Sequence, residues 1–319
     1  MIEMPYLGEL SALATAVCWS FTAIFFSEAG RRVGSFRVNC VRLLFAVAIY
    51  VVVMLVSEGR LFPEDLNRGQ VFYLALSGLI GLVLGDGLGF KALVMIGPRL
   101  TTLLWGTAPI MATIIGRVFL GEELRLVQYG GIALTIGGVS WVVAERRFTS
   151  DSRTKLQAGH PDEGTMFKGV LLGLGAALGQ ATGLILSKHA MLNMGGELDA
   201  LPASFLRMLS SGIMIWTFAL LRGKLVDTLK ALRNGPAMLF AAGGAIFGPF
   251  MGVWTSLIAV ARIPAGIAVT LNSTTPIWII PNVILYYKEK VSLRALIGAV
   301  IAVGGVAVLF LADRITALF

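Results

Sequence analysis

The sequence contains few charged residues. Asp, Glu, Lys and Arg make up 14% of its 319 residues, whereas hydrophobic residues make up 56%. Soluble globular proteins average roughly 25% charged and 45–50% apolar residues. A soluble chain so poor in charge could not cover its own surface with polar groups, so we expect most of the surface to face lipid.

Motifs that carry chemistry are also missing. Cys18 and Cys40 lie in apolar runs without a CxxC motif, far in sequence from His160 and His189. This pattern favours two buried packing cysteines over a metal site. The sequence has no HExxH and no GxxxxGK(S/T) motif. We therefore expect no metal, no cofactor and no ATP hydrolysis within this chain.

The net charge of +8 does not indicate nucleic acid as a partner. The basic residues mostly separate apolar runs, where they orient helices in a bilayer, and no basic patch contains interleaved aromatic residues. No positive residue precedes the first apolar run, so we expect no cleavable signal peptide.

Ten apolar segments are each long enough to span a bilayer, which requires about 20 residues. They lie at 7–28, 37–57, 70–96, 98–119, 125–144, 168–190, 200–221, 235–260, 264–287 and 292–312. The longest polar connection, 145–167, lies mid-chain and is typical of a linker. The sequence thus predicts an all-α integral membrane protein, with five helices in 1–144 and five in 168–319.

The two halves repeat. Most identities follow a shift of 167 positions, while Arg42 matches Arg207 at a slightly different offset. The other matched pairs are Gly85 with Gly252, Thr107 with Thr274, Pro109 with Pro276, Ile110 with Ile277, Glu122 with Glu289, Gly131 with Gly298, and 137–139 with 304–306. Five helices per copy is an odd number, so the second copy enters the membrane from the opposite side. Such inverted repeats are typical of secondary transporters, whose binding site lies near the midplane between the halves.

This pattern resembles a known family. Two halves of five helices, an arginine early in the second and seventh helices, Pro109 and Pro276, and turns at Glu122 and Glu289 before Gly-rich helices are similar to the EamA type of the drug/metabolite transporter superfamily. The resemblance implies a ten-helix fold, a central cavity and export of amino acids or related small metabolites across a bacterial inner membrane.

Two lines of reasoning give opposite orientations of the chain in the membrane. We count sixteen basic residues on the side reached after the first helix and six on the other, leaving out those within spans. By the positive-inside rule, both termini lie outside. The resemblance implies both termini in the cytoplasm. Either way, the termini share one side of the membrane.

Asp86, in the segment LGDGLGF, is the only acid deep within an expected span. Charges within a bilayer are costly and functional by default. Burial disfavours a charged carboxylate, so Asp86 is a candidate proton carrier or cation contact. The alternative is a structural partner, with Arg42 of the neighbouring helix as the best candidate.

Other charges favour structural roles. Arg42 and Arg207 are repeat-equivalent and near enough to a span end to snorkel, with contact to an anionic group as the alternative. Glu122 and Glu289 precede helices, where a carboxylate is stabilised by the exposed amides. Pro109 and Pro276 are expected mid-helix, where proline kinks the chain, and are candidate hinges.

Polar and aromatic residues within the spans are candidates for substrate binding. Aromatic faces, amides and one acid suit a zwitterion or an amine. The candidates are Trp19, Ser20, Asp86, Trp105, Gln180, Trp254 and Asn272. The small residues Ala133, Gly137, Gly298 and Ala302 fit close helix packing, within one subunit or in a homodimer.

The sequence therefore predicts a secondary transporter that exports small metabolites such as amino acids or amines by alternating access. A polytopic membrane enzyme that modifies a lipid or metabolite is the alternative. A channel is disfavoured, because channels are usually built from symmetric subunits around a pore. The expected partners are a small-molecule metabolite and membrane lipid.

Overall fold

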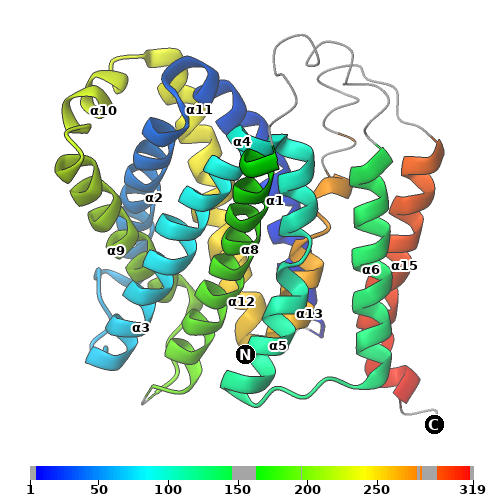
Figure 1. Ribbon diagram of the computed structural model, residues 1–319. Helices are drawn as coiled ribbons and strands as arrows, with labels where there is room; N and C mark the ends of the chain where they lie inside the picture. The colour runs from blue at the N-terminus through cyan, green and yellow to red at the C-terminus, as the bar shows by residue number, and fades with distance from the viewer. Residues whose placement is uncertain (1–4, 146–162, 195, 279–280, 282–292, 317–319) are drawn as a thin grey trace.

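The computed structural model describes residues 5–145, 163–194, 196–278, 281 and 293–316, and no β-strand occurs among them. The helices lie roughly parallel in one bundle (Figure 1). In chain order they are α1 (Leu7–Val33), α2 (Ser35–Glu58), α3 (Arg68–Gly78), η1 (Leu79–Gly85), α4 (Asp86–Trp105), α5 (Ala108–Leu120), α6 (Leu126–Glu145), α8 (Glu163–Leu192), α9 (Ala200–Leu221), α10 (Leu225–Ala231), α11 (Gly235–Ala245), η2 (Ile246–Gly252), α12 (Val253–Arg262), α13 (Ala265–Asn272) and α15 (Leu293–Thr316).

Six helical stretches among the described residues are long and apolar enough to cross a membrane. They are Leu7–Val33, Ser35–Glu58, Arg68–Ala92, Gly164–Leu192, Ala200–Leu221 and Gly235–Arg262. Shorter apolar helices lie at Ala108–Leu120, Leu126–Val142 and Leu296–Ala312. Apolar helices of this length satisfy their own backbone hydrogen bonds, which is what a lipid environment requires.

The two repeats are interleaved rather than placed side by side. The first helix of each half packs along the third helix of the other: α1 contacts α11, η2 and α12, and α8 contacts α3, η1 and α4. Equivalent helices also contact each other, α2 with α9 and α6 with α15, and α5 contacts α13, the two belonging to the expected spans 98–119 and 264–287. Figure 1 shows α1 beginning and α15 ending at the lower end, whereas α6 ends and α8 begins at the upper end. The second copy therefore runs in the opposite direction to the first.

The helix assignment runs through α4 from Asp86 to Trp105 as one element, with Pro98 inside it. The chain nevertheless turns back within it, because the Trp105 ring lies against Gly89, whereas sixteen residues of straight helix would separate them by about 24 Å. This agrees with the break expected at residue 97.

The two prolines expected mid-helix lie elsewhere than predicted. Pro109 lies in the first turn of α5 and not in the middle of a helix. Proline suits a first turn because the N–H that it lacks would have no helical acceptor there. Pro276 likewise lies in the first turn of a helical segment that begins at residue 275.

Both repeats contain a π-helical segment at the same position. The segments η1 (Leu79–Gly85) and η2 (Ile246–Gly252) differ by the shift of 167 that aligns the halves. The Asp86 N–H donates to the Gly81 carbonyl, and the Val253 N–H donates to the Gly248 carbonyl, five residues earlier in each case. π-Helical turns are rare in proteins, and those that occur are often found at functional sites. The sequence patterns did not predict them.

Small residues bring α6 and α15 together at one edge of the bundle (Figure 1). A methyl group on Gly138 would lie 2.6 Å from the Gly298 carbonyl oxygen, and Gly138 also lies against Ala302. These glycines therefore pack within one subunit. Ala133 is exposed and Gly137 has nothing within 4 Å of an added methyl group, so these two lie on the outer face of the pair.

Candidate functional site

Arg42 is the buried cation of the first repeat. It lies in the second turn of α2, is 2% exposed, and donates through Nε to the Asn39 side-chain oxygen at 2.7 Å. The spacing of three residues places both side chains on one face of the helix. The guanidinium also lies 5.7 Å from the centre of the Phe26 ring and 6.0 Å from that of Phe90. These rings exclude water while leaving one edge of the guanidinium for a carboxylate.

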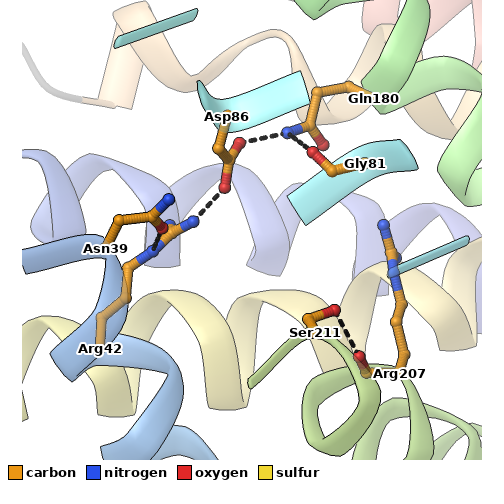
Figure 2. Close-up of polar contacts among 7 residues, drawn as sticks. All are labelled: Asn39, Arg42, Gly81, Asp86, Gln180, Arg207 and Ser211. Carbon is orange, nitrogen blue, oxygen red and sulfur yellow. Dashed lines mark hydrogen bonds and ion pairs between the residues drawn. The ribbon is translucent and has the colours of Figure 1, made fainter. Parts of the chain in front are cut away.

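Asp86 supplies that carboxylate (Figure 2). It is the first residue of α4, directly after η1, and its ion pair with Arg42 joins α4 to α2. Its other oxygen accepts a hydrogen bond from Gln180 Nε2 of α8, and the same Nε2 lies 3.2 Å from the Gly81 carbonyl oxygen. Gln180, from the second repeat, thus bridges an acid and a π-segment carbonyl of the first. The sequence left a structural partner for Asp86 open, and the structure places Arg42 in that position.

Arg207 is equivalent to Arg42 but has a different environment. It is 2% exposed, and its Nε has no hydrogen-bond partner among the described residues. Its Nη2 lies against backbone: methyl groups added to Gly81 and Gly183 would be 2.8 and 3.1 Å away from it. Asp86 and Tyr50 attract the guanidinium electrostatically. Val253 occupies the position equivalent to Asp86, so the second repeat supplies an arginine without an acid.

Tyr50 and Asn39 belong to this cluster and were missed from sequence. Tyr50 of α2 is fully buried, and its hydroxyl donates to the Phe250 carbonyl of η2 at 2.9 Å. It thereby satisfies a carbonyl in the π segment of the other repeat. A tyrosine deep in an apolar run needs such an acceptor, and the spacing of Asn39 from Arg42 was a second available signal.

The predicted tryptophans occupy two equivalent interfaces. Trp105 is 38% exposed and its ring lies against Gly89 of α4, where an added methyl group would be 2.7 Å from the ring. Trp19 of α1 lies beside Gly252, the last residue of η2. Trp254 of α12 packs on Phe250 with ring centres 5.9 Å apart. Asp86, Gln180 and Trp105 therefore lie at the α4–α8 interface, and Trp19 and Trp254 lie at the corresponding α1–η2–α12 interface.

The two remaining candidates, Ser20 and Asn272, form hydrogen bonds with other protein groups. Ser20 is 1% exposed and its hydroxyl donates to the Val17 carbonyl at 2.7 Å. The Asn272 amide lies 3.1 Å from the Ser256 hydroxyl, and with its nitrogen turned toward α1 it donates to the Ala12 carbonyl at 2.9 Å. Asn272 thus joins α13 to α12 and α1. That all seven candidates line one cavity stays a prediction.

Glu122 links the two repeats at the lower end of the molecule. Its carboxylate accepts a hydrogen bond from the Ala265 N–H at 2.7 Å and pairs with Lys188 Nζ at 2.6 Å. Lys188 also donates to the Ile263 carbonyl at 2.8 Å. The sequence predicted that Glu122 would stabilise a helix start. The helix is α13 of the other repeat, and not the helix that comes after Glu122 in the chain. Glu289 lies outside the described residues.

We predict that Lys188→Met weakens this end of the molecule. The Lys188 and Glu122 side chains are 12% and 13% exposed, so the variant leaves a nearly buried carboxylate without its cation. We expect a loss of about 2–4 kcal/mol of stability. The control is Arg60→Met, which removes a solvent-exposed ion pair to Glu64 and should cost less than about 1 kcal/mol. Equal melting temperatures for the two variants would contradict a structural link.

Comparison with known proteins identifies the family of this chain. The sequence model of the EamA-like transporter family matches residues 6–144 and 167–311. The chain belongs to this family. The predicted membership in the EamA type of the drug/metabolite transporter superfamily is therefore confirmed, as is the fold class of an all-α membrane protein with two inverted five-helix repeats.

Two further similarities agree. This EamA-family chain is 28% identical over 133 residues to the "Uncharacterized transporter YyaM" of Bacillus subtilis (strain 168), a match that spans 39% of this chain and 41% of that protein. A crystal structure matches 98% of this chain and 99% of its own with a TM-score of 0.74 at 17% identity, which supports the fold alone. The EamA-family chain is thus a multi-pass membrane protein and a transporter.

Proposed function

We propose that this transporter is a secondary exporter of small metabolites such as amino acids or amines, working by alternating access between its two repeats. The interleaved inverted repeats support this, because mirror-related packings of two similar halves provide two states of similar energy. Without an ATP-binding motif in the sequence, the energy comes from a gradient or from exchange.

The observation that carries the proposal is the Asp86–Gln180 hydrogen bond within the membrane-spanning part of the molecule. It joins α4 of the first repeat to α8 of the second, beside the Gly81 carbonyl of η1. A movement of one repeat against the other must change this polar contact. A substrate bound here is therefore coupled to the movement.

The chemistry of the site suits a zwitterion. Arg42, Arg207 and Asp86 together carry one net positive charge, which favours a ligand with a carboxylate. The partly exposed Trp105 face offers a contact for an ammonium group. Amino acids meet both conditions, and amines meet only the second.

We place this protein in the inner membrane of a bacterium, with both termini on one side and as a monomer or a homodimer. The charge count favours an outside location for the termini, and the family resemblance favours the cytoplasm. A reporter fused after Phe319 that is active only in the cytoplasm would reject the outside location.

The test is a thermal-shift screen of the purified protein against amino acids, amines and sugar phosphates. We predict that amino acids raise the melting temperature. In Gln180→Ala, the apparent affinity derived from this shift should fall about tenfold, the effect of losing roughly one hydrogen bond to a charged group. Gln128→Ala is the control, because Gln128 only accepts from the Arg125 N–H at the start of α6. Stabilisation by sugar phosphates alone would contradict the proposed substrates.

The alternative is a polytopic membrane enzyme. The two functions differ in what happens to the ligand that stabilises the protein. A transporter returns it chemically unchanged after incubation with protein and lipid, whereas an enzyme converts it to a product visible by mass spectrometry.

A further inference from the structure

The buried charges of the two repeats do not match. Arg42 and Arg207 are equivalent and equally buried, but Asp86 is the one acid between them in the part of the chain that the structure describes, since Val253 takes the equivalent position in the second repeat. Asp86 pairs with Arg42, and the Arg207 Nε has no hydrogen-bond partner among the described residues. A buried cation without a counter-ion is costly, so Arg207 is destabilised in this arrangement.

Asp86 and Arg207 approach the same short stretch of backbone. Gln180 Nε2 contacts both the Asp86 carboxylate and the Gly81 carbonyl, and the Arg207 Nη2 lies against Gly81 from the other side. Figure 2 shows the Arg207 guanidinium beside the η1 ribbon, on the side of Gly81 away from Gln180. The electrostatic attraction between Asp86 and Arg207 agrees with this proximity.

The π-helical segment η1, directly before Asp86, can convert to α-helical hydrogen bonding. η1 ends at Gly85, directly before Asp86, and Gly81 and Gly85 both pack on the glycines of α8 without side chains between them. A π segment holds one residue more than the α-helix that it interrupts. Converting η1 to α-helical hydrogen bonding would rotate Asp86 and the rest of α4 by about 100°, the turn of one α-helical residue.

We propose that Asp86 exchanges its partner between Arg42 and Arg207 as the transporter changes state, with η1 providing the movement. The exchange rests on the proposed alternating access. At the position equivalent to Asp86 the second repeat has Val253, so Arg207 has no acid of its own repeat there. In the other state, Arg207 holds the carboxylate that Arg42 holds in this structure, and the single acid is the element that distinguishes the two states.

Hydrogen–deuterium exchange tests this without a substrate. The segment 263–268 is the reporter, because the Ala265 N–H donates to Glu122 across the repeats in this state. In Arg207→Met the carboxylate stays with Arg42, so exchange in 263–268 should stay as slow as in the wild type or become slower. In Arg42→Met the carboxylate moves to Arg207, so the same segment should exchange about tenfold faster or more.

Stability supplies the second measurement. Arg207→Met removes an uncompensated cation and should keep or raise the melting temperature while transport falls at least about tenfold. Arg42→Met should fold, because Arg207 replaces the lost cation, but the double variant leaves Asp86 without any arginine. Its loss of melting temperature should exceed the sum of the two single changes.

The outcomes separate the two proposals. Opposite changes in the deuterium exchange rate of 263–268 in Arg207→Met and Arg42→Met, without transport of any tested metabolite, would support the exchange of ion-pair partners and contradict the proposed substrates. Two results would overturn the exchange of ion-pair partners. The first is transport together with a change in the deuterium exchange rate of 263–268 in the same direction in both variants. The second is a double variant whose loss of melting temperature equals the sum of the single changes. Should Arg42→Met not fold, Arg42→Lys provides the comparison. It keeps the charge but loses the Nε bond to Asn39, and must shift the exchange in the same direction by less.

Discussion

Asp86→Asn is expected to lower the stability of the protein by about 3–5 kcal/mol, because it leaves the Arg42 guanidinium buried without a counter-ion. The Arg42 and Asp86 side chains are 3% and 16% exposed, so water cannot replace the lost carboxylate charge. Thermal unfolding of the purified variant measures this. The control is Asp227→Asn, which removes an exposed carboxylate 3.9 Å from Arg37 and should cost less than about 1 kcal/mol.

The same variant also distinguishes whether Asp86 acts as the counter-ion of Arg42 or as a proton carrier. A stable Asp86→Asn protein that still exchanges substrate, but no longer accumulates it with a pH gradient, would contradict the ion-pair account and support Asp86 as the coupling residue. A stable variant with unchanged gradient-driven transport would exclude both roles.

Gly179→Val is expected to disrupt the interface between α8 and η1. A methyl group on Gly179 would lie 2.9 Å from the Ile80 carbonyl oxygen and 3.0 Å from the Gly85 Cα. These are backbone atoms that cannot rotate away, so the two helices must separate. Overpacking of this kind costs about 1–3 kcal/mol or more, and it also moves Gln180 away from Asp86. We expect a lower melting temperature together with weaker ligand binding.

The matched control is Gly87→Val, one residue beyond Asp86 on α4. A methyl group there meets nothing within 4 Å. The change should therefore be neutral or slightly stabilising, since most residues favour a helix more than glycine does, by up to about 1 kcal/mol. Equal melting temperatures for Gly179→Val and Gly87→Val would contradict the close approach of η1 and α8.

The repeat and its inversion could be predicted from sequence, because matched residues such as Arg42 and Arg207 keep their order along the chain. The π segments could not. The sequence of η1, LIGLVLG, is as apolar as an ordinary spanning helix, and the extra residue depends on packing against α8. Contacts across the repeats were equally hidden. Glu122 precedes one helix in sequence but stabilises the start of α13, 143 residues later.

The site was predicted in part for the same reason. Asp86 could be identified because an acid within a span is conspicuous, and Arg42 because it lies on the neighbouring helix. Tyr50 is not conspicuous, because its hydroxyl finds its acceptor on η2, 200 residues away in sequence. Pro109 was expected to kink a helix, but a new helix starts at Ala108, so the proline lies in a first turn and interrupts nothing.

Counterflow in proteoliposomes tests the central claim most directly. Vesicles are loaded with an excess of an unlabelled neutral amino acid and diluted into a trace of the same amino acid in labelled form. A secondary transporter that alternates between two states predicts a transient, saturable accumulation of label above equilibrium, which Gly179→Val reduces and Gly87→Val does not. Label that enters without saturation or overshoot for every amino acid and amine tested, in vesicles that contain folded protein, would contradict the account.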